Sequence, residues 1–205
     1  SSVTDIKQYA FNSCSLNKID IPQSTIRIGN CSFSHCGQLK QISLPSSLTQ
    51  IGKCCFSYCL SLEKIIIPFS ITSINDSIFY GCKSLAQIVI PSSVNSLEES
   101  SFDKCISIKQ ISIPPSVTSL GRMSFCCCTS LIQISIPYSV TFIPLSCFNG
   151  CSSLMHVSIP SSIIRIDYGA FKGCSSLSSI TLPDKVTSIG NYAFQACSSL
   201  SSITL

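Results

Sequence analysis

The sequence predicts an α/β-type repeat solenoid of about nine units, which runs through residues 1–205 as a single domain. Three recurring residues predict it: a phenylalanine at gaps of 22 and then 23 residues, a cysteine three positions after each phenylalanine, and a proline at the same period. A fixed period of roughly 20–50 residues is the signature of a chain that folds as stacked, similar units. The phenylalanines are Phe11, Phe33, Phe56, Phe79, Phe102, Phe125, Phe148, Phe171 and Phe194.

Each unit reads F-x-x-C-x-x-L-x-x-I-x-I-P-x-x-V-x-x-I-G-x-x-x. The segment I-x-I alternates apolar and variable positions, which predicts a short strand with one buried face. Proline then ends the strand, because it has no N–H to donate to a ladder. The remaining apolar positions, V-x-x-I and the next phenylalanine, predict a second layer of turns or short helices that leads back to the next strand.

A single unit of 23 residues cannot bury its own apolar positions, but stacked units can share one continuous core. The stacked strands would lie parallel and about 4.8 Å apart, so nine of them would span roughly 40 Å. The period falls within the roughly 20–29 residues of leucine-rich repeats. We therefore expect a right-handed leucine-rich-repeat coil, with a parallel β-sheet on its concave face and turns or short helical segments on its convex face.

The unit is clearest in residues 171–190, which read FKGCSSLSSITLPDKVTSIG. This pattern extends over the whole chain and resembles the BspA-like class of leucine-rich repeats. The resemblance implies a surface or secreted protein that mediates adhesion to host cells or matrix proteins. The Ser- and Cys-rich units look more like protozoan members than bacterial ones, in which asparagine often takes the cysteine place. The chain begins inside a unit and ends on a strand, so we expect a fragment without caps.

Composition and charge exclude several classes of protein. The chain is 45% hydrophobic and only 11% charged, which excludes a disordered chain and a charge-rich coiled coil. No apolar run reaches the roughly 18 residues of a membrane span. The net charge of +4 comes from scattered residues, whereas nucleic-acid binding needs a clustered basic patch. We expect neither a membrane span in this chain nor a nucleic-acid partner.

The 15 cysteines fall into two groups. Nine occupy the repeat column, and we interpret them as small buried hydrophobic residues with free thiols, because parallel Cβ vectors disfavour disulfides between neighbouring units. The other six lie beside a repeat phenylalanine, and their redox state stays open. A metal cluster of Cys31, His35 and Cys36 is conceivable, but a loop histidine beside a structural cysteine is favoured, and no C-x-x-C occurs. The six are Cys31, Cys54, Cys55, Cys126, Cys127 and Cys147.

No group of catalytic residues is present in the sequence. The two histidines, His35 and His156, are five repeats apart, or roughly 25 Å along the solenoid. The acidic residues are dispersed, and neither G-x-G-x-x-G nor G-x-x-x-x-G-K-[ST] occurs. We therefore expect no enzymatic activity, no cofactor and no metal.

The candidate ligand-binding surface is the outward side of the concave strands, because alternate strand residues point away from the core. This surface is mostly neutral and polar. Ile66 and Val89 are adjacent apolar residues on it, with Phe69 just past the strand end, and such residues either mark a contact site or add cross-strand packing. Ile132, Met155 and Tyr138 form a second possible apolar group, and for Ile132 and Met155 packing is favoured. The predicted site consists of Lys18, Asp20, Gln41, Ser43, Lys64, Ile66, Phe69, Gln87, Val89, Gln110, Ser112, Gln133, Ser135, His156 and Ser158.

The favoured function is a non-catalytic protein-binding module, located at the cell surface or secreted, whose concave face binds a host-cell or matrix protein or another repeat protein. The first alternative is a cytoplasmic interaction scaffold or regulatory subunit, because many free thiols are typical of a reducing compartment. A second alternative is an enzyme whose catalytic domain lies outside these residues.

Overall fold

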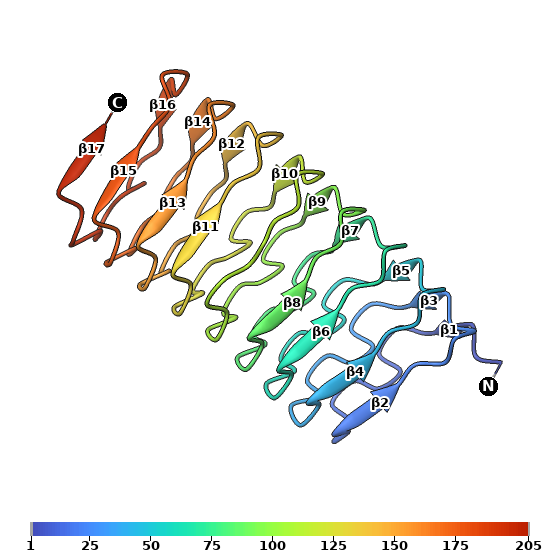
Figure 1. Cartoon of the computed structure of the whole chain (residues 1–205). Coiled ribbons are helices and arrows are strands. Elements are labelled where there is room, and N and C mark those ends of the chain that lie inside the picture. Colours follow the sequence, from blue (N-terminus) through green and yellow to red (C-terminus); the bar gives the residue numbers. More distant parts are fainter. Residues whose placement is uncertain (1, 205) are drawn as a thin grey trace.

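The computed structural model describes residues 2–204, which form a β-solenoid whose turns stack along one axis, with the two ends of the chain at opposite ends of the stack (Figure 1). Each turn contributes strands to two rows. The three-residue strands form what we call the long-strand face: β2 (Lys18–Asp20), β4 (Gln41–Ser43), β6 (Lys64–Ile66), β8 (Gln87–Val89), β11 (Gln133–Ser135), β13 (His156–Ser158), β15 (Ser179–Thr181) and β17 (Ser202–Thr204).

The second row consists of two-residue strands, which return the chain behind the long-strand face. These strands are β1 (Asp5–Ile6), β3 (Arg27–Ile28), β5 (Gln50–Ile51), β7 (Ser73–Ile74), β9 (Ser96–Leu97), β10 (Ser119–Leu120), β12 (Phe142–Ile143), β14 (Arg165–Ile166) and β16 (Ser188–Ile189). Between β8 and β11 the long-strand row is represented only by Gln110, which forms an isolated parallel bridge with Gln133.

All strand pairs are parallel and join equivalent positions of successive units. Lys64 pairs with Gln87 and Ile66 with Val89 between β6 and β8. A slip of one residue would turn every apolar side chain outward, so the repeated pattern itself holds this register. Within residues 2–204 the long-strand ladder is interrupted between β4 and β6, between β8 and Gln110, and between β13 and β15.

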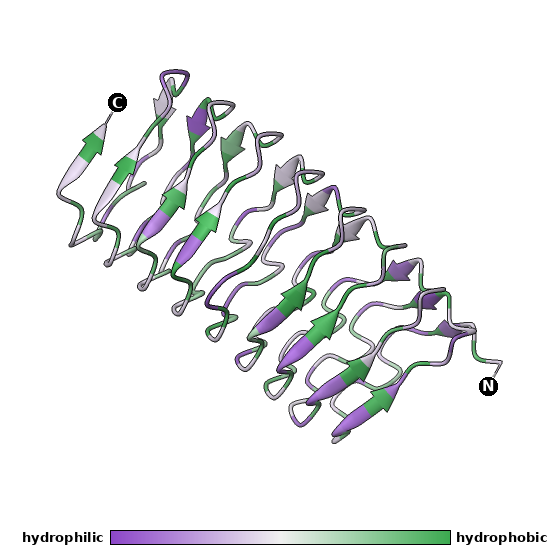
Figure 2. Ribbon diagram, viewed as in Figure 1, coloured by the Kyte–Doolittle hydropathy of each residue, from purple (hydrophilic) through white to green (hydrophobic). Residues whose placement is uncertain are grey.

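The core consists of the repeated apolar columns, which recur at the same place in each strand (Figure 2). A stack of phenylalanine rings runs through it from Phe11 to Phe194. Successive ring centroids are 5.1–5.8 Å apart and the ring planes are within 17° of parallel. The seven rings from Phe33 to Phe171 have no exposed surface. Such offset stacking adds to the stabilisation that the buried area alone provides.

The expected short helices on the far side are absent from the part of the chain that the structure describes, so this part of the prediction was wrong. The V-x-x-I segments form the two-residue strands instead, and the phenylalanine segments form turns. In every turn the residues two before and two after the phenylalanine have a positive φ, between 51° and 74°. An α-helix cannot continue through two left-handed residues only four positions apart.

Hydrogen bonding in the phenylalanine turns also opposes a helix. Around Phe56, the N–H groups of Cys54, Phe56 and Tyr58 donate to carbonyls of the following turn at 2.7–2.9 Å. Only the alternate residues, Ser57 and Cys59, donate locally to the third residue before them. In this phenylalanine turn, alternate backbone N–H groups therefore bond to the following turn. These bonds join successive turns in a region that has no β-strands.

The cysteine column has a hydrogen-bonding role that the sequence interpretation missed. Each column thiol from Cys36 to Cys197 donates to the carbonyl oxygen of the phenylalanine in the preceding turn, at 3.0–3.2 Å. Burial raises the pKa of these thiols, most strongly in the middle of the solenoid. All 15 cysteines are free thiols in this structure. The column residues are therefore buried, as expected, but they act as donors as well as small apolar groups.

Serine residues form a second column of this kind, two positions after the proline. Ser93, Ser116 and Ser162 each donate to a carbonyl of the preceding turn at 2.6–2.7 Å. Serine hydroxyl groups thus supply hydrogen bonds between turns at positions where no backbone ladder joins them.

Over residues 2–204 no helix is long and apolar enough to cross a membrane.

Candidate functional site on the long-strand face

All fifteen predicted site residues have exposed side chains on the long-strand face or just beyond its strand ends. The alternation is clear in β6, where Ile65 is 1% exposed while Lys64 and Ile66 on either side of it face outward. The outward orientation of these side chains agrees with the alternation in the sequence, while their role in ligand binding stays a prediction. Their arrangement along it, however, depends on where the ladder is interrupted.

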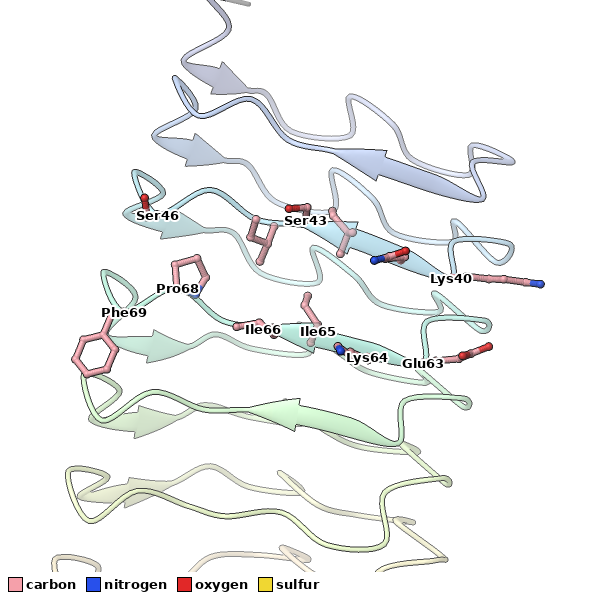
Figure 3. Close-up of a pocket in the computed structure, with 12 residues that line it drawn as sticks. Lys40, Ser43, Ser46, Glu63, Lys64, Ile65, Ile66, Pro68 and Phe69 are labelled. Carbon is pink, nitrogen blue, oxygen red and sulfur yellow. The ribbon is translucent and has the colours of Figure 1, made fainter.

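A hollow of about 520 Å³ lies at the interruption between β4 and β6. Its apolar end is formed by Pro68 and Phe69, and its polar end by Lys40 and Glu63 (Figure 3). Ile66 lies between the two ends. The lining residues are Lys40, Gln41, Ile42, Ser43, Leu44, Ser46, Glu63, Lys64, Ile65, Ile66, Pro68 and Phe69.

An exposed apolar patch borders this hollow and consists of Ile66, Phe69 and Val89. These side chains are 59%, 70% and 61% exposed, respectively. Ile66 and Val89 are directly paired across β6 and β8, so their side chains lie next to each other. We call these three residues the apolar patch. A contiguous apolar group in polar surroundings is a typical mark of a contact surface.

The charges beside the apolar patch are available to a partner. Lys18 lies 3.4 Å from the carboxylate of Asp20 and is thereby partly neutralised. Lys40 and Lys64, at the edge of the hollow, form no ion pair with any other residue of the described range 2–204. The hollow thus combines apolar side chains with two unpaired cations and the carboxylate of Glu63.

Two further hollows on the same face are more polar. One, of about 420 Å³, lies at the interruption between β13 and β15 and contains His156. The other, of about 450 Å³, lies over Gln110, Gln133 and Ser135. The second apolar group also differs from the apolar patch, because Ile132 is half-buried and the Tyr138 hydroxyl is hydrogen-bonded to Ser161. Tyr138 and Met155 are 71% and 47% exposed, so packing as the role of this group stays a prediction.

The histidine–cysteine cluster considered at Cys31, His35 and Cys36 does not form a metal-binding arrangement. Cys36 donates its thiol to the Phe11 carbonyl, and His35 stacks on the Tyr58 ring with centroids 4.6 Å apart. His35 instead begins a row of surface aromatic rings on the phenylalanine turns, in which Tyr80 follows Tyr58. The signal for this row was visible in the sequence, since these residues lie one or two positions after successive repeat phenylalanines.

Comparison with known proteins shows the repeat family and the fold. The chain matches the BspA type leucine rich repeat region in six copies over residues 4–132 and 118–205. A leucine-rich repeat protein of T. pallidum is 26% identical, with 96% of this chain and 82% of that chain covered and a TM-score of 0.65. A leucine-rich repeat protein of Bacteroides ovatus is 30% identical, with 99% and 70% covered and a TM-score of 0.51.

The pneumococcal vaccine antigen PcpA has the same fold at 20% identity and a TM-score of 0.62, over 99% of this chain and 54% of that chain. No curated protein matches the chain.

Proposed function

Because the chain belongs to the BspA-type leucine-rich repeat family, we propose that it is a non-catalytic protein-binding module whose long-strand face receives a protein partner. Leucine-rich repeat proteins are generally interaction modules, and stacked repeats create the extended surfaces used for this purpose. The observation that carries the proposal is the apolar patch of Ile66, Phe69 and Val89 beside the hollow between β4 and β6.

The patch and its surroundings indicate what a partner presents. An apolar side chain of the partner covers Ile66 and Val89 or enters the hollow beside Phe69, and an acidic group next to it meets Lys40 or Lys64. Fully burying one large apolar side chain contributes about 1.5–3 kcal/mol. Binding energy is concentrated in a few such central contacts, while the polar residues around them exclude water. The remaining predicted residues, such as Gln133 and Ser158, form the polar surroundings.

We also propose that the protein acts at the cell surface or as a secreted adhesion protein that contacts a host cell or matrix protein. Support comes from the fold that it shares with the pneumococcal vaccine antigen PcpA. The alternative is a cytoplasmic interaction scaffold, which the 15 free thiols favour. Antibody labelling of source cells before and after permeabilisation separates the two: labelling of intact cells supports the surface location, and labelling only after permeabilisation supports the scaffold. The protozoan character of the repeats stays a prediction.

The binding proposal is tested by the double variant Ile66→Asp with Val89→Asp, which places two carboxylates on the apolar patch. Purified protein is titrated against host cells and a panel of extracellular matrix proteins. We expect binding to weaken at least tenfold, which corresponds to about 1.4 kcal/mol. The matched control is Ser179→Asp with Ser202→Asp, which adds the same charge to an exposed pair of the same face outside the predicted site. Unchanged binding in the first variant, or an equal loss in both, contradicts the assignment of the patch.

A further inference from the structure

Three potential metal ligands meet on two adjacent turns, away from the long-strand face. Asp103 directly follows Phe102, and Cys126 and Cys127 follow Phe125 one repeat later. One ligand atom from each of the three side chains lies within 4.8 Å of those of the other two. The two sulfur atoms are 3.6 Å apart. The backbone holds the turns together here, because the Lys104 N–H donates to the Cys126 carbonyl at 2.8 Å.

Asp103 is an unusual residue for its position. Its side chain is only 2% exposed, and its Oδ1 atom is buried without any hydrogen-bond partner in the described structure. A buried carboxylate with an unsatisfied oxygen is costly unless a proton or a cation neutralises it. The neighbouring Lys104 is exposed, and its ammonium group lies over the ring of Tyr80, with the Nζ atom 4.8 Å from the ring centroid. The Oδ1 atom therefore has no donor within the described residues, while the same carboxylate lies close to the Cys126 and Cys127 thiols.

We propose that Asp103, Cys126 and Cys127 bind a divalent transition-metal cation, for which zinc has the matching ligand chemistry. Zinc takes thiolate ligands at about 2.3 Å and carboxylate oxygens at about 2.0–2.2 Å in a tetrahedral arrangement. Two thiolates on a tetrahedral zinc would be about 3.8 Å apart by this geometry, close to the observed 3.6 Å. The sulfur atoms need almost no rearrangement to hold the ion.

Access and charge agree with a three-ligand site. Cys126 is buried, but Cys127 is half-buried and therefore partly open to solvent. The ion would enter past Cys127, and a water molecule would take the fourth coordination position there. Cys127 has a φ of 55°, and its sulfur atom lies 3.6 Å from that of Cys126. The two thiols lose their protons on binding, as metal-bound cysteines do. Two thiolates and one carboxylate then carry a charge of −3, which the dication reduces to −1 beside Lys104.

The test uses cobalt(II), a spectroscopic substitute for zinc, titrated into the reduced full chain without oxygen. We expect one tetrahedral cobalt per chain, with a thiolate-to-cobalt charge-transfer band that zinc abolishes by displacement. The variant Cys127→Ser changes a half-exposed residue and is not expected to disturb the fold, and it should lose the band. Asp103→Asn should weaken cobalt binding at least tenfold. Cys54→Ser is the matched control, because Cys54 is also half-buried and precedes another cysteine but belongs to no group of three potential metal ligands among the described residues.

Two results would overturn the proposal. The first is the absence of a charge-transfer band in the wild-type protein, in which case Asp103 is a protonated acid that the thiols merely surround. The second is a band that persists in Cys127→Ser or disappears in Cys54→Ser, which would place the metal on other thiols. Thermal unfolding gives an independent readout: zinc should raise the Tm of the wild type and of Cys54→Ser but not of Asp103→Asn.

Discussion

Replacing Cys82 tests whether the cysteine column stabilises the solenoid by hydrogen bonding as well as by packing. The Cys82 side chain has no exposed surface, and its thiol donates to the Phe56 carbonyl oxygen at 3.0 Å. The same oxygen accepts the Cys59 N–H at 3.1 Å. Loss of the thiol therefore leaves the carbonyl with one partner, so the full cost of an unsatisfied buried acceptor does not arise.

The three substitutions of Cys82 separate the two contributions. Cys82→Ala removes a buried atom of roughly methyl size, which costs about 0.5–1.5 kcal/mol, and a weak hydrogen bond worth about 0.5 kcal/mol. The expected total is about 1.5 kcal/mol. Cys82→Ser keeps a donor for the same carbonyl and should cost about 1 kcal/mol. Cys82→Val keeps the volume but places a methyl group against the carbonyl oxygen, and such overpacking costs about 1–3 kcal/mol.

The assay is guanidinium-induced unfolding of the reduced protein, followed by far-UV circular dichroism. The expected order of stability is Ser, then Ala, then Val, and a half-buried cysteine outside the column, changed as Cys54→Ala, should shift the midpoint much less. If the column cysteines were only small apolar residues, valine would be the best tolerated substitution and serine the worst. That order would refute the role of the thiol as a donor.

Three further predictions concern the core. Burial raises the pKa of Cys82 and Cys147 from 9.0 to about 12, so the fold favours the neutral thiol. The stability that each of these thiols contributes should be complete below pH 9 and fall by about 1.4 kcal/mol per pH unit between pH 9 and 12, and circular dichroism during an alkaline titration that stayed flat would contradict this. Phe148→Ala should cost about 3–5 kcal/mol in guanidinium unfolding, because the ring is fully buried between two others; a loss under 1 kcal/mol would contradict the stack. Gly52→Ala should lower the Tm by several degrees, because its Cβ would overlap the backbone nitrogen of Asn30. Gly37→Ala, whose Cβ would meet nothing closer than 3.9 Å, serves as the control and should leave the Tm unchanged.

The repeat and its exposed face could be predicted from the sequence because both depend on periodicity. A gap of 23 residues between phenylalanines implies the register that pairs Ile66 with Val89, and alternation implies that both point outward. The helices could not be excluded in this way. The left-handed φ values that break them occur at residues as different as Tyr58, Lys104 and Met123, and only four of the 18 positions are glycine. Residue type therefore carried no signal of the backbone conformation.

The metal-ligand cluster had a signal in the sequence that only an alignment of the units brings out. Asp103 and Cys126 are separated by one period of 23, so they occupy the same position in successive turns. Read along the chain, the acid and the cysteines are far apart and match no ligand spacing. The hollow between β4 and β6 had no such signal, because the repeat pattern continues unchanged through the turns where the ladder is interrupted.

The unusual composition of the chain follows from how its turns are joined. Each turn contacts only its neighbours, so the stack is as rigid as the bonds between adjacent turns. Side chains of cysteine and serine supply many of these bonds by donating to carbonyls of the preceding turn, as Cys151 and Ser162 do. Small neutral donors are suited to this role, because a charged side chain would have to be buried at a high cost. Serine and cysteine thus provide the hydrogen bonds between turns that charged side chains could provide only at a high desolvation cost. The long-strand face, with its few lysines and apolar residues, is therefore held by well-joined turns. A surface that is already ordered loses little entropy on binding, so even a patch as small as Ile66, Phe69 and Val89 can contribute most of its burial to affinity.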